Sequence, residues 1–150
     1  MLSKNHLRSL ALGAVLALGV SSLAIAVAGP VEDRQSDMKA IGQAMKDGAG
    51  LNAPTAFDAA KAKLAMSAVA DSAKKAASLF PAGSGVDPKT AADPKIWENN
   101  ADFLKRLAEL QTLATTASNA TTVEAYKPAF AAVGATCKSC HDVYRKKKPG

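Results

Sequence analysis

Apolar residues recur every three or four positions over most of the chain after residue 29, and this spacing predicts amphipathic helices. The first helix is expected at about residues 31–47 and the second at about residues 55–79. Each of them ends where glycines or prolines interrupt the pattern. The next stretch, PAGSGVDPKTAADP, is so rich in glycine and proline that we expect a loop there.

Two further helices are predicted in the C-terminal half. The third should begin just after Asp93, whose carboxylate can cap free backbone amides, and Pro94 suits the first helical position. Its apolar stripe covers residues 96–117. The fourth begins at a candidate capping box, residues 121–124, and its stripe continues almost to the end of the chain. Pro128 predicts a kink or a short preliminary turn before the main part of this helix.

Four helices with short or moderate connections predict an all-α fold. The arrangement typical of this pattern is an antiparallel four-helix bundle with up-down-up-down topology. Cofactor sites in such bundles are built from side chains that face inward from neighbouring helices. The pattern shows neither an internal repeat nor a second domain.

Residues 1–28 have the features of a secretory signal peptide. Lys4 and Arg8 precede an uncharged apolar run, and an Ala-Val-Ala cleavage pattern precedes Gly29. The alternative is an uncleaved membrane anchor, which the glycines and serines within the run disfavour. We therefore expect export to the periplasm, removal of the signal peptide, a single domain at residues 29–150 and no membrane contact of the mature chain.

The charge balance narrows the function only slightly. The chain has 19 Lys and Arg side chains against 13 Asp and Glu, a formal net charge of +6. Without Lys4 and Arg8 the balance is 17 against 13, a net charge of +4. Such a mild excess is typical of a soluble surface, and we expect no nucleic-acid partner. The sequence contains no acid-base pair, nucleophile constellation or phosphate-binding loop, so an enzyme is not predicted.

The strongest chemical signal lies close to the C-terminus. Cys137, Cys140 and His141 form Cys-x-x-Cys-His, the spacing that attaches a c-type haem through two thioether bonds and supplies a histidine ligand to the iron. On a helix these three positions share one face, so all three side chains can address the same flat ring. The motif continues the apolar stripe of the fourth helix, and we expect it on the buried face of that helix.

Two cysteines at this spacing have three other common uses. A zinc site requires four ligands, more than the mature chain offers as cysteine and histidine. A thioredoxin-like dithiol lies at a helix N-terminus near a βαβ pattern, which this sequence lacks. A structural disulfide stays open as an alternative, although it leaves the adjacent histidine without a role.

A second protein ligand to the iron would have to come from upstream, because no methionine follows the motif. The candidates are Met38, Met45 and Met66, and core packing is the default role for each. In an antiparallel bundle the first and last helices are neighbours, and Met38 lies at about the same height as His141. Met45 lies about two turns, roughly 10 Å, further away. Met38 is therefore the candidate axial ligand, and a residue that only fills the distal side is the alternative.

With these residues known, the chain resembles the class II cytochromes c, namely cytochrome c prime and its low-spin relatives of the cytochrome c-556 type. CKSCHDVYRKK is similar to the family's attachment site, DRQSDMKAIGQAMK to its first helix and DPKIWENNADF to its third. The resemblance implies a four-helix bundle with one covalently attached haem c, with His141 as an axial ligand. It also implies that Arg34 and Gln35 lie near the haem propionates.

The resemblance implies one of two functions. In the low-spin branch, Met38 ligates the iron and the protein transfers electrons between redox partner proteins. In the cytochrome c prime branch the iron is five-coordinate, Met38 only lines the distal side, and small gases such as NO or CO bind. The strings around Met38 and the third helix are closer to the low-spin branch, and we expect electron transfer. Members of the family also form homodimers, which leaves a homodimer open here.

Overall fold

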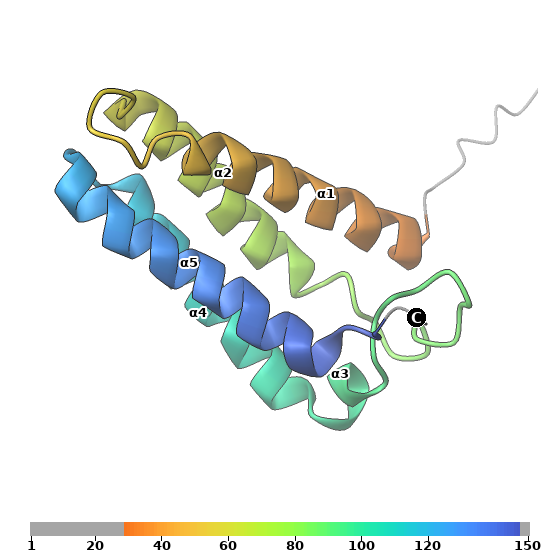
Figure 1. Cartoon of the computed structure of the whole chain (residues 1–150). Coiled ribbons are helices and arrows are strands. Elements are labelled where there is room, and N and C mark those ends of the chain that lie inside the picture. Colours follow the sequence, from red (N-terminus) through yellow and green to blue (C-terminus); the bar gives the residue numbers. More distant parts are fainter. Residues whose placement is uncertain (1–28, 148–150) are drawn as a thin grey trace, which may run out of the picture.

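The structure, a computed structural model of the chain, describes residues 29–147. The signal peptide expected at residues 1–28 lies outside the described residues. Four long helices pack side by side, and a fifth helix of a single turn lies at one end of them (Figure 1). Their bounds are α1 Pro30–Ala49, α2 Ala59–Ala76, α3 Lys95–Glu98, α4 Asn100–Ser118 and α5 Val123–Tyr144. The predicted all-α four-helix bundle is confirmed.

The second helix is shorter than its apolar pattern predicted. Asp58 is its N-cap, and Asp58 Oδ1 accepts a hydrogen bond from the Lys61 amide at 3.0 Å. Residues 55–57 therefore belong to the connection with α1 rather than to the helix. The helix ends at Ala76, and two turns carry the chain to Leu79. A side-chain cap sets the start of this helix, because it satisfies an amide that the first turn leaves unpaired.

The predicted third helix is divided into α3 and α4. Asp93 accepts a hydrogen bond from the Lys95 amide at 3.0 Å, but the N-cap of α3 is Pro94, one residue later than expected. The backbone then leaves the helical region at Asn99, with φ −126° and ψ 49°. Trp97, on the short α3, donates from its indole nitrogen to the carbonyls of Phe80 (3.2 Å) and Pro81 (3.0 Å). The turn is separate because it is anchored to the long loop and not to the axis of α4.

Pro128 lies inside α5, which runs as one helix from Val123 to Tyr144, so no separate preliminary turn precedes its main part. Thr122 caps it, accepting a hydrogen bond from the Ala125 amide at 3.3 Å, one residue later than the predicted capping box. Pro128 removes only one backbone hydrogen bond, close to the helix start, where few such bonds have yet formed.

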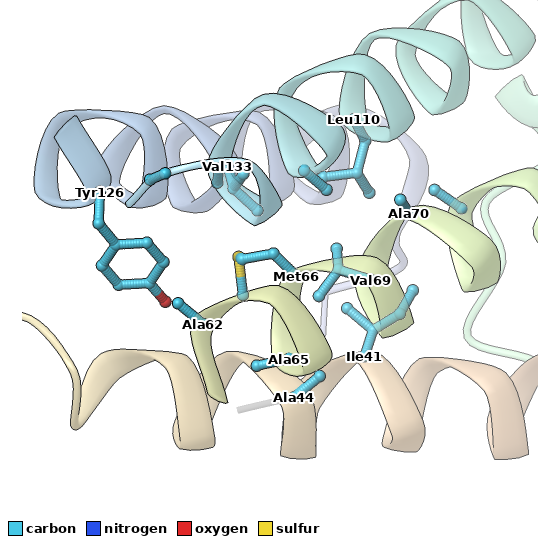
Figure 2. Close-up of a cluster of buried hydrophobic side chains, with 14 of the residues drawn as sticks. Ile41, Ala44, Ala62, Ala65, Met66, Val69, Ala70, Leu110, Tyr126 and Val133 are labelled. Carbon is cyan, nitrogen blue, oxygen red and sulfur yellow. The ribbon is translucent and has the colours of Figure 1, made fainter. Parts of the chain in front are cut away.

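The core is built mainly around α2, whose buried face consists mostly of alanines (Figure 2). Small side chains let neighbouring helices approach closely, and the larger Met66 and Val69 fill the space between them. Met66 belongs to α2, is fully buried and lies near the side chains of Tyr126 and Val133. A second cluster at the other end of the bundle contains Ala76, Ala92, Ile96, Phe103, Leu107 and Tyr144.

The chain after α5 closes the end of the bundle that carries α3. Arg145 forms an isolated antiparallel bridge with Ala92, and the Lys146 amide donates to the Ala91 carbonyl at 2.8 Å. The Asp93 amide donates in turn to the Tyr144 carbonyl at 2.9 Å. The end of the Cys-x-x-Cys-His helix is therefore held against the long loop. No helix within residues 29–147 combines the length and apolarity needed to cross a membrane.

Candidate functional site

A narrow cleft opens between α1, α4 and α5. The helix α2 packs closely on α1 and α4, and α5 packs on α4, whereas α1 and α5 make few contacts with each other. The cleft lies where these two helices diverge. Its lining residues are Met38 and Ile41 from α1, Arg106, Leu107 and Leu110 from α4, and Thr136, Cys137, Cys140 and His141 from α5.

The structure brings the three motif residues to the edge of this cleft. Cys137 and Cys140 are half-buried free thiols, and burial raises the pKa of both. His141 is exposed, which corrects the expectation that the whole motif lies on the buried face. The difference arises because α1 and α5 make few contacts, so neighbouring side chains cover the imidazole only in part.

Two effects lower the pKa of the His141 imidazole and so favour its neutral form. Removal of water by the surrounding atoms lowers its pKa, and the Arg145 guanidinium lowers it further. Asp142 opposes these effects to a smaller extent. A neutral imidazole has a free nitrogen lone pair, which a metal ligand needs.

Of the three methionines considered, Met38 is the one that lines the cleft. It is half-buried and packs against both core clusters, so it lies at the level where they meet. Met45 packs only against the first cluster, and Met66 is fully buried inside it. The structure thus brings Met38 together with the Cys-x-x-Cys-His motif and leaves the other two in core positions.

The chemistry of the cleft fits a haem c. Two thiols lie on one helix beside an imidazole, a thioether faces them from α1, and the walls between them are the aliphatic side chains Ile41, Leu107 and Leu110. Imidazole and thioether are the donor pair of many c-type haems, and an aliphatic wall suits a flat apolar ring. Within residues 29–147, no three His, Cys, Asp or Glu side chains gather into a metal-binding group.

Arg34 does not line the cleft. Its side chain is buried, with 4% of the residue exposed. Its guanidinium donates to the Ser84 carbonyl (2.7 Å), to Ser84 Oγ (3.0 Å) and to the Leu79 carbonyl (3.5 Å). It also lies over the rings of Phe80 (4.9 Å) and Trp97 (5.9 Å). These contacts direct its donors to the long loop. Burial also lowers the pKa of the Arg34 guanidinium.

Gln35 is exposed and makes a related contact. Its side-chain amide donates to the Lys89 carbonyl at 3.0 Å, further along the same loop. Gln35, like Arg34, is absent from the cleft lining. The two residues that the resemblance assigned to the haem propionates thus tie α1 to the loop in this structure.

Sequence reasoning missed one charged residue of the site, Arg106 on α4. It lines the cleft beside Cys140, and its Nε donates to Asp102 Oδ2 at 2.6 Å. The Tyr144 hydroxyl donates to the same carboxylate oxygen at 2.7 Å. Both hydrogen bonds lower the pKa of Asp102. The four-residue spacing of Asp102 and Arg106 is visible in the sequence as a helix-surface pair, but the contact with Tyr144 is not.

The chain was then compared with known proteins. A family model described as Cytochrome C' matches residues 29–145. The chain is 38% identical over 144 residues to a cytochrome c' of Rhodopseudomonas palustris, covering 95% of this chain and 98% of the relative. It is 39% identical over 128 residues to a cytochrome c-556 of Agrobacterium fabrum, covering 83% and 86%.

Solved structures show the same similarity. The cytochrome c' from Rhodopseudomonas palustris superposes with a TM-score of 0.75 at 36% identity, covering 82% of this chain and all of the other. A second cytochrome c', described as having an unusual ligand-controlled dimer dissociation, has a TM-score of 0.69 at 32% identity, covering 81% of this chain and all of the other. The relatives include cytochromes c' and c-556, so they do not decide between the two branches.

Proposed function

Because the chain belongs to the cytochrome c' family, whose members are haem proteins, we propose that it carries electrons through one haem c held in the cleft between α1 and α5. In this proposal Cys137 and Cys140 form the two thioether bonds. His141 and Met38 are the two axial ligands. The observation that carries the proposal is that a single cleft is lined by the Cys-x-x-Cys-His motif and by one methionine from the opposite helix.

Each residue has a defined role in this proposal. Haem c, when bound, supplies one-electron chemistry between Fe(II) and Fe(III). The neutral imidazole of His141 offers a lone pair, and the thioether of Met38 is a soft donor that favours the reduced state. Ile41, Leu107 and Leu110 keep water away from the ring faces, which also raises the reduction potential.

The second candidate function is reversible binding of a small gas such as NO or CO. In that case Met38 only lines the distal side and His141 is the single protein ligand. The observation that favours this candidate is the similarity to proteins named cytochrome c', two of which are matched over most of their length. One of these is described as having ligand-controlled dimer dissociation, so a homodimer that responds to a ligand belongs to this candidate.

The optical spectrum of the purified holoprotein separates the two candidates. We expect a low-spin ferric spectrum with a methionine-to-iron charge-transfer band, and slow or incomplete CO binding after reduction. Met38→Ala should convert it to a high-spin spectrum. Met45→Ala is the matched control, because Met45 lies on the same helix outside the cleft, and its spectrum should stay low-spin. A high-spin wild-type spectrum with ready CO binding would support the gas-binding candidate instead.

Haem attachment is tested separately. After denaturing electrophoresis the wild-type polypeptide should keep a haem stain, because thioether bonds survive unfolding. Cys137→Ser combined with Cys140→Ser should lose the stain, whereas either single change should keep part of it. A wild-type band without stain would contradict the proposal and favour a structural disulfide.

Export is also part of the proposal. Residues 1–28 are the proposed signal peptide, residues 29–150 the mature domain, the periplasm its location and other redox proteins its partners. Mass spectrometry of the protein recovered from the periplasm should give a mature N-terminus at or close to Gly29. Recovery of the full-length chain in the membrane fraction would instead indicate an uncleaved anchor.

A further inference from the structure

We propose that Asp102 and Tyr144 hold the positive charge of Arg106 in a fixed position at the cleft, where this charge raises the reduction potential of the haem site. The proposal rests on the proposed function, because it concerns the haem held by the Cys-x-x-Cys-His motif. It concerns α4, a helix that contributes neither an attachment residue nor an axial ligand.

The positive charge of Arg106 lies at the cleft. Among the cleft-lining residues, Arg106 is the one whose side chain carries a permanent charge. Arg34, the cation that the sequence suggested, donates to the loop carbonyls instead. Arg106 is therefore the cation that lines the cleft beside Cys140, whereas Arg145, which acts on the His141 imidazole, is absent from the cleft lining.

The Arg106 side chain is held in one orientation by its neighbours. Asp102 holds Arg106 by a 2.6 Å hydrogen bond to Nε, and the guanidinium lies over the Tyr144 ring at 5.8 Å. The Tyr144 hydroxyl reaches the same Asp102 oxygen at 2.7 Å, and Tyr144 is itself buried at 3% exposure. An isolated surface pair would lose its orientation to side-chain motion, but a buried ring on a second helix restricts this one.

The ion pair of Arg106 and Asp102 has a defined direction relative to the cleft. Arg106 lines the cleft and Asp102 does not, so the positive end of the pair faces the cleft. A ferric haem carries one more positive charge than a ferrous haem. A fixed cation nearby therefore destabilises the ferric state, and its carboxylate partner partly offsets this effect. Arg106 should raise the potential and Asp102 should lower it.

These opposite signs make a sharp experiment. The midpoint potentials of the holoproteins are measured by redox titration for the wild type, Arg106→Gln and Asp102→Asn. We expect a lower potential in Arg106→Gln and a higher one in Asp102→Asn. Asparagine still accepts hydrogen bonds, so it removes the charge while it keeps the geometry. Arg106→Lys keeps the charge and should lie closer to the wild type than Arg106→Gln does.

The matched control is Lys105→Gln. It makes the same change of charge on the next residue of α4, but Lys105 is exposed and does not line the cleft. Its potential should stay close to that of the wild type, because solvent and salt screen an exposed charge. A shift as large as that of Arg106→Gln would overturn the proposal, since it would show only a general effect of net charge.

Other results of the same redox titrations also test the proposal. Unchanged potentials in Arg106→Gln and Asp102→Asn would overturn the proposal, and so would shifts in the same direction, which indicate loss of packing instead of loss of charge. Haem stain and spectrum, recorded on the same samples, test the proposed function independently. A variant with covalent haem, a wild-type spectrum and an unchanged potential leaves the proposed function intact and removes this inference. If Arg106→Gln does not assemble, the rise expected for Asp102→Asn decides alone.

Discussion

Tyr126 fixes the end of the bundle that lies away from α3. Its ring is fully buried between Phe57 and Phe130, with ring centroids 5.5 Å from each. Its hydroxyl donates to the Gly48 carbonyl at 3.0 Å and so connects α5 to the end of α1. Burial raises the pKa of Tyr126 to about 12, because the charged phenolate would lose its hydration.

This pKa predicts a dependence of stability on alkaline pH. The folded protein holds the phenol proton more tightly than the unfolded chain, whose tyrosine has a pKa of 10.0. The contribution is therefore fully present below about pH 10 and is lost as the pH rises to about 12. Tyr126→Phe should be less stable at pH 8, but should lose less stability between pH 9 and 11.5. Chemical denaturation at these pH values measures the free energy of unfolding of the wild type and of Tyr126→Phe. If the two free energies fall equally with pH, the prediction is contradicted.

Gly48 is a residue at which any side chain is too large. A Cβ there would lie 2.6 Å from the Tyr126 hydroxyl, 2.8 Å from the Phe130 ring and 2.9 Å from the terminal methyl of Met66. We expect Gly48→Ala to lower the free energy of unfolding by about 1–3 kcal/mol, as overpacking does. At Gly50 the nearest atom is 3.6 Å away, so Gly50→Ala should change it by less than about 0.5 kcal/mol. Equal effects in urea unfolding would contradict this account.

The loop between α2 and α3 is held by two helices and by the chain that follows α5. Arg34 on α1 binds it near Ser84, Trp97 on α3 binds it at Phe80 and Pro81, and the chain after α5 pairs with it further along. Gly85 allows the close approach of the Trp97 ring, since a Cβ there would lie 2.5 Å from it. A long glycine- and proline-rich loop is thereby kept against the bundle.

Arg34→Gln tests this anchoring. Because a hydrogen bond to a charged group contributes about 1.5–3 kcal/mol, we expect a loss of roughly 2–3 kcal/mol in unfolding and faster limited proteolysis of the loop. Gln35→Ala should change the stability and the rate of loop proteolysis only slightly, since the one hydrogen bond of this side chain is exposed. If Arg34→Gln instead keeps its stability and shifts the reduction potential, the propionate role that the family resemblance implies is supported and the anchoring role is not.

The helices themselves were predicted well where local chemistry sets their limits. The first helix agrees with the pattern within two residues at each end, and Asp93 accepts the expected hydrogen bond. The errors arose where tertiary contacts decide. Asn99 separates α3 from α4 beside a tryptophan that is bonded to a distant loop. A local pattern contains no information about such a partner.

At the scale of the whole molecule, two methionines that look alike in the sequence should behave differently. Met66 is fully buried in the hydrophobic core (Figure 2). Met38 lines the cleft. Met66→Ala should cost about 2–5 kcal/mol of stability and leave the spectrum of the holoprotein unchanged. Met38→Ala should change the spectrum. Thermal unfolding and absorption spectra of both variants check this, and a spectral change in Met66→Ala would contradict the assignment of roles.

The sequence alone determined the fold class, the Cys-x-x-Cys-His spacing and the preference for Met38. These follow from the regular rise of a helix, which sets which residues share a face and how far each lies from a helix end. Only the tertiary structure decided that Arg34 binds the long loop and that Arg106 faces the cleft with Asp102 and Tyr144. The direction of a long charged side chain depends on which distant carbonyls and carboxylates packing brings within reach, and spacing along the chain does not determine that.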